Sequence, residues 1–138
     1  MNADLVHLLE EFSKLALECD GLSRVLSYTL YRRGIDHGFV VGRLDVDGKT
    51  AARPHAWLRV GEETVDFRAR MWAGEHDYVP NGVFLQKDYP RVAYVAERAD
   101  FPAQPVSKTV YDILVTQTHE HAKMLRAMLD SSGEARTG

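Results

Sequence analysis

The 138-residue chain has a single cysteine, Cys19, which excludes an internal disulfide framework and a metal site built on several cysteines. It has no apolar run close to the roughly 20 residues of a membrane span. Its first residues lack the basic region and apolar core of a signal peptide. Internal repeats and low-complexity stretches are also missing. These absences predict a cytoplasmic protein whose thiol stays reduced.

Charge of one sign is also scarce, since the formal net charge is only −3 and the basic residues are scattered. This balance gives no electrostatic basis for binding nucleic acid or an anionic membrane surface. Hydrophobic residues make up 45% of the chain and charged residues 27%, which is typical of a soluble globular protein. We expect one domain over residues 1–130 and a disordered tail over 131–138.

Hydrophobic periodicity changes along the chain from helical to strand-like and back. Helical periods are predicted over Asp4–Leu17, Asp20–Arg33 and Ser107–Leu129. Strands are predicted over His37–Val46, His55–Val60, Thr64–Phe67, Gly82–Leu85 and Arg91–Glu97. The Asp47-Gly48 pair is a strong turn signal between the first two strands. The pattern predicts an α+β fold, with N-terminal helices on an antiparallel sheet of about five strands and a long C-terminal helix.

Cys19 lies where the second helix is expected to begin. A thiol at a helix N-terminus meets unpaired backbone N–H groups and the positive end of the helix dipole, which favour the nucleophilic thiolate. A lone cysteine is more often an apolar filler of the core. Here the polar sequence Glu18-Cys19-Asp20-Gly21 indicates a helix entry instead, although the charge of Asp20 opposes the thiolate.

His55 and Asp66 lie in two successive strand-like runs and are candidates for the base and the group that orients it. Pairing through a Gly61-Glu62-Glu63 turn would place Asp66 opposite Leu58 and His55 three residues further along. Contact between the two side chains then requires a diagonal reach or a bulge. The alternatives are a surface histidine and a carboxylate bonded to the backbone near the turn.

Two other features have simpler interpretations. His119 and His121 are two residues apart and point to different sides of a helix, so a metal site there is not favoured over a solvated face. No cofactor is expected. Trp57 and Trp72 are candidate substrate-binding residues, with Trp57 sharing a face with His55, although aromatic residues more often serve packing.

Taken together, these residues resemble the core of the transglutaminase-like cysteine proteinases, which have a papain-like fold. The resemblance lies in Cys19-Asp20-Gly21-Leu22-Ser23, the sequence Pro54-His55-Ala56-Trp57, and Val65-Asp66. It covers about a third of the chain and is closest to small bacterial members, such as the leader peptidases of lasso-peptide maturation. It implies that Cys19 is the nucleophile, His55 the base and acid, and Asp66 the residue that orients His55.

The chain departs from the family pattern at the oxyanion site. Papain-like enzymes usually place a glutamine or similar donor before the cysteine, but the first glutamine here is Gln86 and no tryptophan precedes Cys19. We therefore keep two hypotheses. One is thiol-dependent amide-bond chemistry on a protein or peptide through an acyl-enzyme, by a peptidase, deamidase or acyltransferase. The other is an inactive transglutaminase-like module that binds such a partner.

Overall fold

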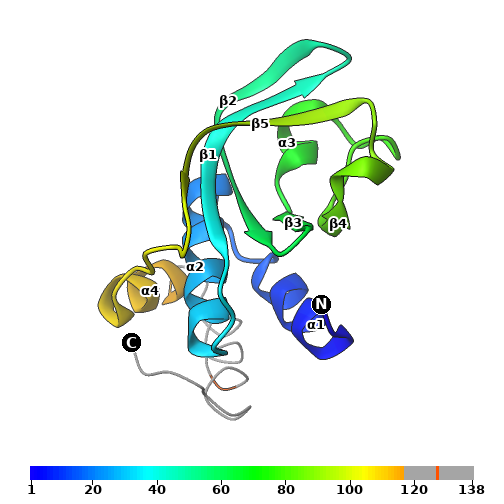
Figure 1. Cartoon of the computed structure of the whole chain (residues 1–138). Coiled ribbons are helices and arrows are strands. Elements are labelled where there is room, and N and C mark those ends of the chain that lie inside the picture. Colours follow the sequence, from blue (N-terminus) through cyan, green and yellow to red (C-terminus); the bar gives the residue numbers. More distant parts are fainter. Residues whose placement is uncertain (117–126, 128–138) are drawn as a thin grey trace.

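A computed structural model describes residues 1–116 and residue 127 of the chain (Figure 1). The elements follow the order α1 (Ala3–Phe12), α2 (Cys19–Arg32), β1 (Gly38–Val46), β2 (Lys49–Val60), β3 (Glu63–Asp66), α3 (Ala69–Ala73), β4 (Gly82–Leu85), η1 (Gln86–Asp88), β5 (Val92–Asp100) and α4 (Lys108–Val115). The predicted α+β class is confirmed, with N-terminal helices packed on a five-stranded antiparallel sheet.

The strands lie in the order β4-β3-β2-β1-β5, and all neighbours are antiparallel. Strands β1 to β4 form a meander, and β5 returns to pair with the outer side of β1. β3 pairs with β2 only over Leu58–Val60. The first half of β2 therefore has no strand beside it on the β3 side, where the N-terminus of α2 approaches the sheet (Figure 1).

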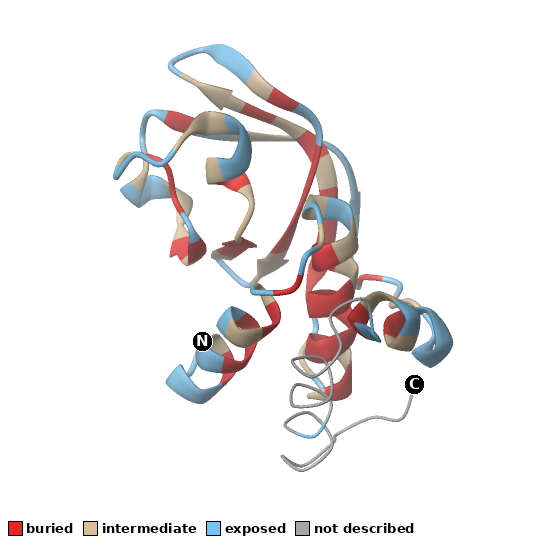
Figure 2. Ribbon diagram, turned by 180° about the vertical axis from the view of Figure 1, so that it is seen from behind, coloured by how far each residue is buried: buried red, intermediate tan, exposed pale blue. Residues whose placement is uncertain are grey.

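Two apolar clusters hold the elements together. The larger lies between the helices α1, α2 and α4 and one face of the sheet, where Leu9, Phe12, Val25, Leu30 and Leu58 are fully buried. The smaller lies near the β1–β2 hairpin and includes Leu44, Ala52, Ala69, Val79 and Val92. Most residues of α2 from Leu22 onward are buried, and so are the consecutive residues 55–58 of β2 (Figure 2). These segments are therefore covered on both sides.

The first helix is shorter than its sequence pattern predicts, because α1 ends at Phe12 and not at Leu17. Leu15 keeps its predicted apolar position and is buried, although it lies in the loop after the helix. Carbonyl oxygens of Ser13, Leu15 and Leu17 accept hydrogen bonds from the guanidinium of Arg68, a partner distant in sequence. This tertiary contact replaces the intrahelical bonds that a longer helix would have made.

The strand carrying His55 starts earlier than predicted. β2 begins at Lys49, directly after the confirmed tight turn at Asp47 and Gly48, whose φ angles are 51° and 79°. His55 lies inside this strand and is 0% exposed, so it is neither at a loop edge nor on the surface. Pro54 is compatible with the strand because the ladder to β3 does not reach it.

The predicted register between β2 and β3 is wrong by one residue. Leu58 pairs with Val65, not with Asp66, because the hairpin closes in the two residues Gly61-Glu62. Gly61 adopts a φ of 59°, which a glycine takes at little cost in so tight a turn. Continuing this register places Asp66 across from Trp57. Asp66 therefore shares a face with His55, since side chains alternate along a strand.

The remaining predictions are only partly covered by the structure. The helix predicted over Ser107–Leu129 is seen as α4, Lys108–Val115, and its later part lies outside the described residues except for residue 127. The predicted tail, 131–138, and His119-Glu120-His121 also lie outside them. Within the part that is described, no helix has the length and apolar character needed to cross a membrane.

Candidate active site

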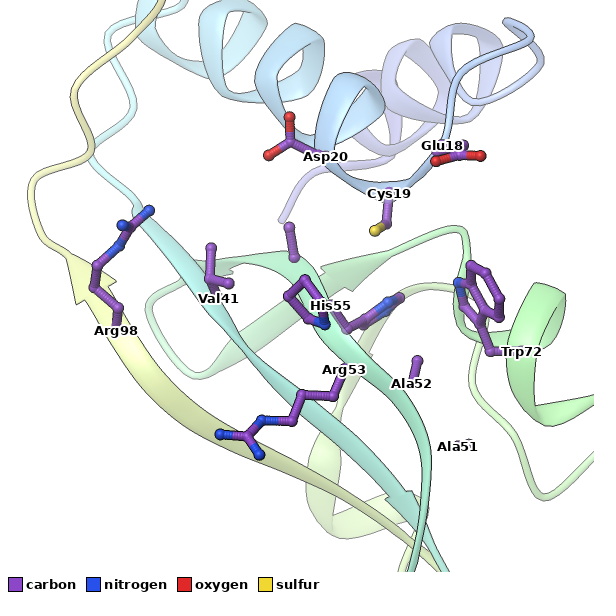
Figure 3. A pocket seen from close by; sticks show the side chains of 12 residues that line it. Glu18, Cys19, Asp20, Val41, Ala51, Ala52, Arg53, His55, Trp72 and Arg98 are labelled. Carbon is purple, nitrogen blue, oxygen red and sulfur yellow. The ribbon is translucent and has the colours of Figure 1, made fainter.

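Cys19 is the first residue of α2 and faces a cavity of about 580 Å³ (Figure 3). The residue before it, Glu18, occupies the N-cap position but makes no side-chain hydrogen bond to the helix. Serine, threonine, aspartate or asparagine would normally cap the first backbone N–H groups at this position. The first turn of α2 therefore offers its N–H groups and its positive dipole end beside the sulfur.

His55 reaches the same cavity from β2. Its Nε2 lies 2.7 Å from Oδ2 of Asp66, and both side chains are almost completely buried. Its Nδ1 is also buried and makes no hydrogen bond of regular geometry. With Nε2–H donated to Asp66, the neutral ring presents the lone pair of Nδ1, and this is the nitrogen left to interact with the thiol of Cys19.

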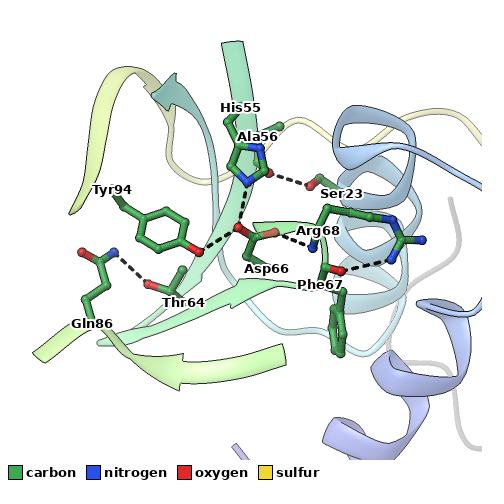
Figure 4. Close-up of polar contacts among 9 residues, drawn as sticks. All are labelled: Ser23, His55, Ala56, Thr64, Asp66, Phe67, Arg68, Gln86 and Tyr94. Carbon is green, nitrogen blue, oxygen red and sulfur yellow. Dashed lines mark hydrogen bonds and ion pairs between the residues drawn. The ribbon is translucent and has the colours of Figure 1, made fainter. Parts of the chain in front are cut away.

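Asp66 is held by three donors (Figure 4). Oδ2 accepts from His55 and, at 2.8 Å, from the hydroxyl of Tyr94, while Oδ1 accepts from the backbone N–H of Arg68 at 2.8 Å. A buried carboxylate needs such partners, because an unpaired charge away from water is costly. Asp66 is thus fixed from β2, from β5 and from the turn after β3.

The backbone of β2 contacts the start of α2 at Ala56. The carbonyl oxygen of Ala56 accepts a hydrogen bond from the Ser23 hydroxyl at 3.3 Å. The backbone N–H of Ala56 donates to the sulfur of Cys19. Both contacts use the part of β2 that β3 leaves unpaired. They fix the distance between the helix that carries the thiol and the strand that carries the imidazole.

The electrostatics of the pair favour charge separation. Burial opposes the thiolate, but hydrogen bonds from His55 and from the Ala56 N–H outweigh it, so the pKa of Cys19 lies below its usual value. Burial likewise opposes the imidazolium, yet the bonds to Asp66 and Cys19 raise the pKa of His55 to about 9. A lowered pKa of the thiol beside a raised pKa of the imidazole favours a thiolate next to an imidazolium, and the two groups titrate as a pair.

The two tryptophans occupy different places. Trp72 on α3 lines the Cys19 cavity and is 52% exposed, which agrees with its predicted position at the site. Trp57 is 2% exposed and lines a separate cavity with Tyr94 and Gln86 instead. Its ring packs 6.1 Å from the His55 ring and 5.0 Å from that of Tyr94. Trp57, a candidate substrate-binding residue, therefore does not line the Cys19 cavity.

The rest of the cavity combines small and charged side chains. Ala51 and Ala52 of β2 lie beside Trp72, and the carboxylates of Glu18 and Asp20 flank Cys19. Arg53 and Arg98 also line the cavity, and the Arg53 guanidinium is paired with Glu97. Among residues 1–116 and 127, no group of three or more histidine, cysteine, aspartate or glutamate side chains is arranged to hold a metal ion.

Sequence reasoning did not find Tyr94 or Arg68 as parts of the site. Tyr94 is one of several aromatic residues in strand-like runs, and nothing in its neighbours indicates a bond to Asp66. Arg68 stands two residues after Asp66, and this spacing is the only local signal. Gln86, the first glutamine of the chain, donates to the Thr64 hydroxyl at 2.9 Å and does not line the Cys19 cavity.

Comparison with known proteins adds no relative to this description. No family model, no curated protein and no solved structure matches the chain. The geometry of the site is therefore what bears on its function.

Proposed function

We propose that the protein carries out thiol-dependent chemistry on amide bonds, with Cys19 as nucleophile, His55 as base and acid, and Asp66 as the residue that orients His55. One arrangement carries this proposal: a buried imidazole bonded at Nε2 to a carboxylate, with its other nitrogen left to a thiol at an uncapped helix N-terminus. The resemblance to papain-like, transglutaminase-like proteinases is consistent with it.

In the proposed reaction the Cys19 thiolate attacks the carbonyl carbon of the substrate, and the carbonyl electron pair moves to oxygen. Collapse of this intermediate breaks the C–N bond, and imidazolium His55 gives its proton to the leaving amine. The product is a thioester on Cys19. Water, deprotonated by His55, then attacks the thioester, releasing a carboxylic acid and restoring the thiol. An amine in place of water would give acyl transfer.

The first turn of α2 supplies the oxyanion site in this proposal. The backbone N–H of Cys19 adjoins the sulfur, and Glu18 does not cap that turn. Backbone N–H groups directed at a developing oxyanion are a common source of transition-state stabilisation.

The substrate class we propose is a protein or peptide, acted on in a reducing compartment such as the cytoplasm. The cavity lies between the N-terminus of α2 and the unpaired half of β2, and Trp72 and two alanines form one side of it. The volume of the cavity is in the range of small-ligand pockets, so it can hold a few residues of a peptide or protein substrate.

An activated ester tests the acyl-enzyme directly. With 4-nitrophenyl acetate, the protein should release one equivalent of nitrophenolate in a burst and then continue at a steady rate. Mass spectrometry should place the acetyl group on Cys19 during turnover. Cys19→Ser and His55→Ala should abolish the burst. Absence of a burst from the folded wild-type protein would overturn the proposal.

The alternative is a module that keeps the fold and binds a peptide without turnover. The lining of the Cys19 cavity favours it, because no side-chain amide is among the residues that line it, and Gln86 is bonded to Thr64, away from the thiol. Such a module would acylate once and deacylate no faster than a thioester in water. Turnover well beyond one equivalent separates the enzyme from the module.

A further inference from the structure

Arg68 connects two parts of the candidate site that lie on different elements. Its backbone N–H donates to Oδ1 of Asp66 at 2.8 Å. Its side chain extends the other way, toward residues 13–18 between α1 and α2, which we call the nucleophile loop. Nε donates to the Leu17 carbonyl at 2.7 Å, and one terminal nitrogen donates to the Ser13 and Leu15 carbonyls at 2.8 and 2.9 Å.

The nucleophile loop contains no helix or strand, and its own backbone bonds are short-range ones, such as those from the N–H groups of Lys14, Leu15 and Leu17. Arg68 adds an external donor to three of its carbonyl oxygens. The planar guanidinium presents several donors in a fixed arrangement and stays charged at all working pH values. Hydrogen bonds from a charged donor to carbonyl oxygens are stronger than neutral ones.

The position of these bonds matters for catalysis. Leu17 is two residues before Cys19, so the bond to its carbonyl fixes the chain where it enters α2. The other end of the same residue fixes the carboxylate that holds His55. Displacement of the nucleophile loop would move the sulfur relative to the imidazole, although neither catalytic side chain had changed.

We propose that Arg68 is a positioning residue that keeps the Cys19 thiol within reach of His55 by tying the nucleophile loop to the turn that carries Asp66. This inference rests on the proposed function of the Cys19 site. Arg68 does not line the Cys19 cavity and need not touch the substrate. Because its charge also acts on the Cys19 thiolate, Arg68→Lys, which keeps the charge, isolates the geometric part.

Arg68→Gln and Arg68→Met test the inference, with Arg70→Gln as the matched control. Arg70 is also partly buried and also donates to a backbone carbonyl, that of Val79, but it has no bond to the nucleophile loop. The measurement is the rate of Cys19 alkylation by iodoacetamide against pH, made below the melting temperature of each variant.

Both Arg68 variants should shift the alkylation midpoint toward that of a free thiol and lower the rate at pH 6.5 about tenfold, as one pKa unit implies. Arg70→Gln should stay within about twofold of wild type, and Arg68→Lys should fall between, since an ammonium cannot span three carbonyls. A purely structural role would lower the melting temperature without moving the midpoint.

A folded Arg68→Gln or Arg68→Met protein with the wild-type midpoint overturns the inference. So does failure of both variants to fold, because the contact would then serve the fold as a whole. Failure of the proposed function looks different. In that case wild-type Cys19 already titrates like a free thiol, and His55→Ala leaves its alkylation unchanged.

Discussion

Gly42 lies directly opposite His55 in the β1–β2 ladder, at the place where the pairing is interrupted on both sides of β1. The ladder to β2 shifts between Gly42 and Leu44, and the ladder to β5 shifts between Val41 and Gly42. Bulges of this kind bend a strand and re-aim the side chains beside it. The bend occurs where His55 has to meet both Asp66 and Cys19.

Gly42→Ala should destabilise the protein and disturb the site. A Cβ at Gly42 would overlap the carbonyl oxygen of Val95, so the β5 backbone would have to move. We expect the free energy of unfolding to fall by about 1–3 kcal/mol, the usual cost of overpacking. Chemical denaturation measures it. The control is Gly21→Ala, whose Cβ meets Leu17 at an ordinary 3.5 Å and should leave stability equal or up to about 1 kcal/mol higher. Equal stability of both variants would contradict the prediction.

The pH dependence of Cys19 alkylation should reveal the pair. Because the thiol pKa is lowered, the thiolate persists as pH falls below the midpoint of about 8.5 for a free thiol, and alkylation should remain fast there. His55→Ala removes a hydrogen bond and a charge but leaves the burial that raises the pKa. Its midpoint should therefore move above that of a free thiol, with a loss of at least about tenfold at pH 6.5. An unshifted midpoint in this variant would exclude a thiolate–imidazolium pair.

Asp66→Asn should move the alkaline limb of the pH–rate profile, for ester or peptide hydrolysis, to lower pH. The imidazolium of His55 persists to about pH 9 because Asp66 bonds and attracts it, and activity should fall as pH rises through that value. A neutral amide removes the attraction, so the limb should shift by about one pH unit or more. Ring ¹⁵N chemical shifts of His55 against pH provide the measurement.

The matched variant for Asp66→Asn is Tyr94→Phe, which removes the other donor to Oδ2 and keeps the carboxylate. Burial and the adjacent Asp66 raise the pKa of Tyr94, so its hydroxyl stays protonated and gives no titration of its own. We expect the free energy of unfolding to fall by about 1 kcal/mol. The alkaline limb of the pH–rate profile should stay close to that of wild type. If the alkaline limb moves as far as in Asp66→Asn, the orientation of the Asp66 carboxylate, and not its charge, sets the pKa of His55.

Much of this arrangement follows from local sequence patterns. The apolar positions of α2, the Asp47-Gly48 turn and the apolar run of β1 predict these elements, because each is a local property of the sequence. The candidates Cys19, His55 and Asp66 follow from residue type together with the resemblance to the transglutaminase-like proteinases. Local patterns do not predict contacts between distant segments. The guanidinium of Arg68 binds carbonyl groups of the loop after Phe12, more than 50 positions away in sequence, where the apolar pattern predicts a continued helix.

Register is the second limit. A turn of two residues in place of three at Gly61 moves Asp66 from the face of Leu58 to that of Trp57 and His55. The sequence Gly61-Glu62-Glu63 allows either turn, and the choice depends on how Val65 and Leu58 pack together beneath α2. One residue of register thus decides whether the imidazole and the carboxylate share a side of the sheet.

Intrinsic fluorescence should separate the two tryptophans and test the cavity. Trp57 is buried and Trp72 is half exposed beside Cys19, so acrylamide should quench Trp72 strongly and Trp57 hardly at all. Trp72→Phe should leave a blue-shifted emission that resists quenching. If acrylamide quenches the Trp72→Phe protein as strongly as wild type, Trp57 is not the buried tryptophan and Trp72 is not the exposed one beside Cys19.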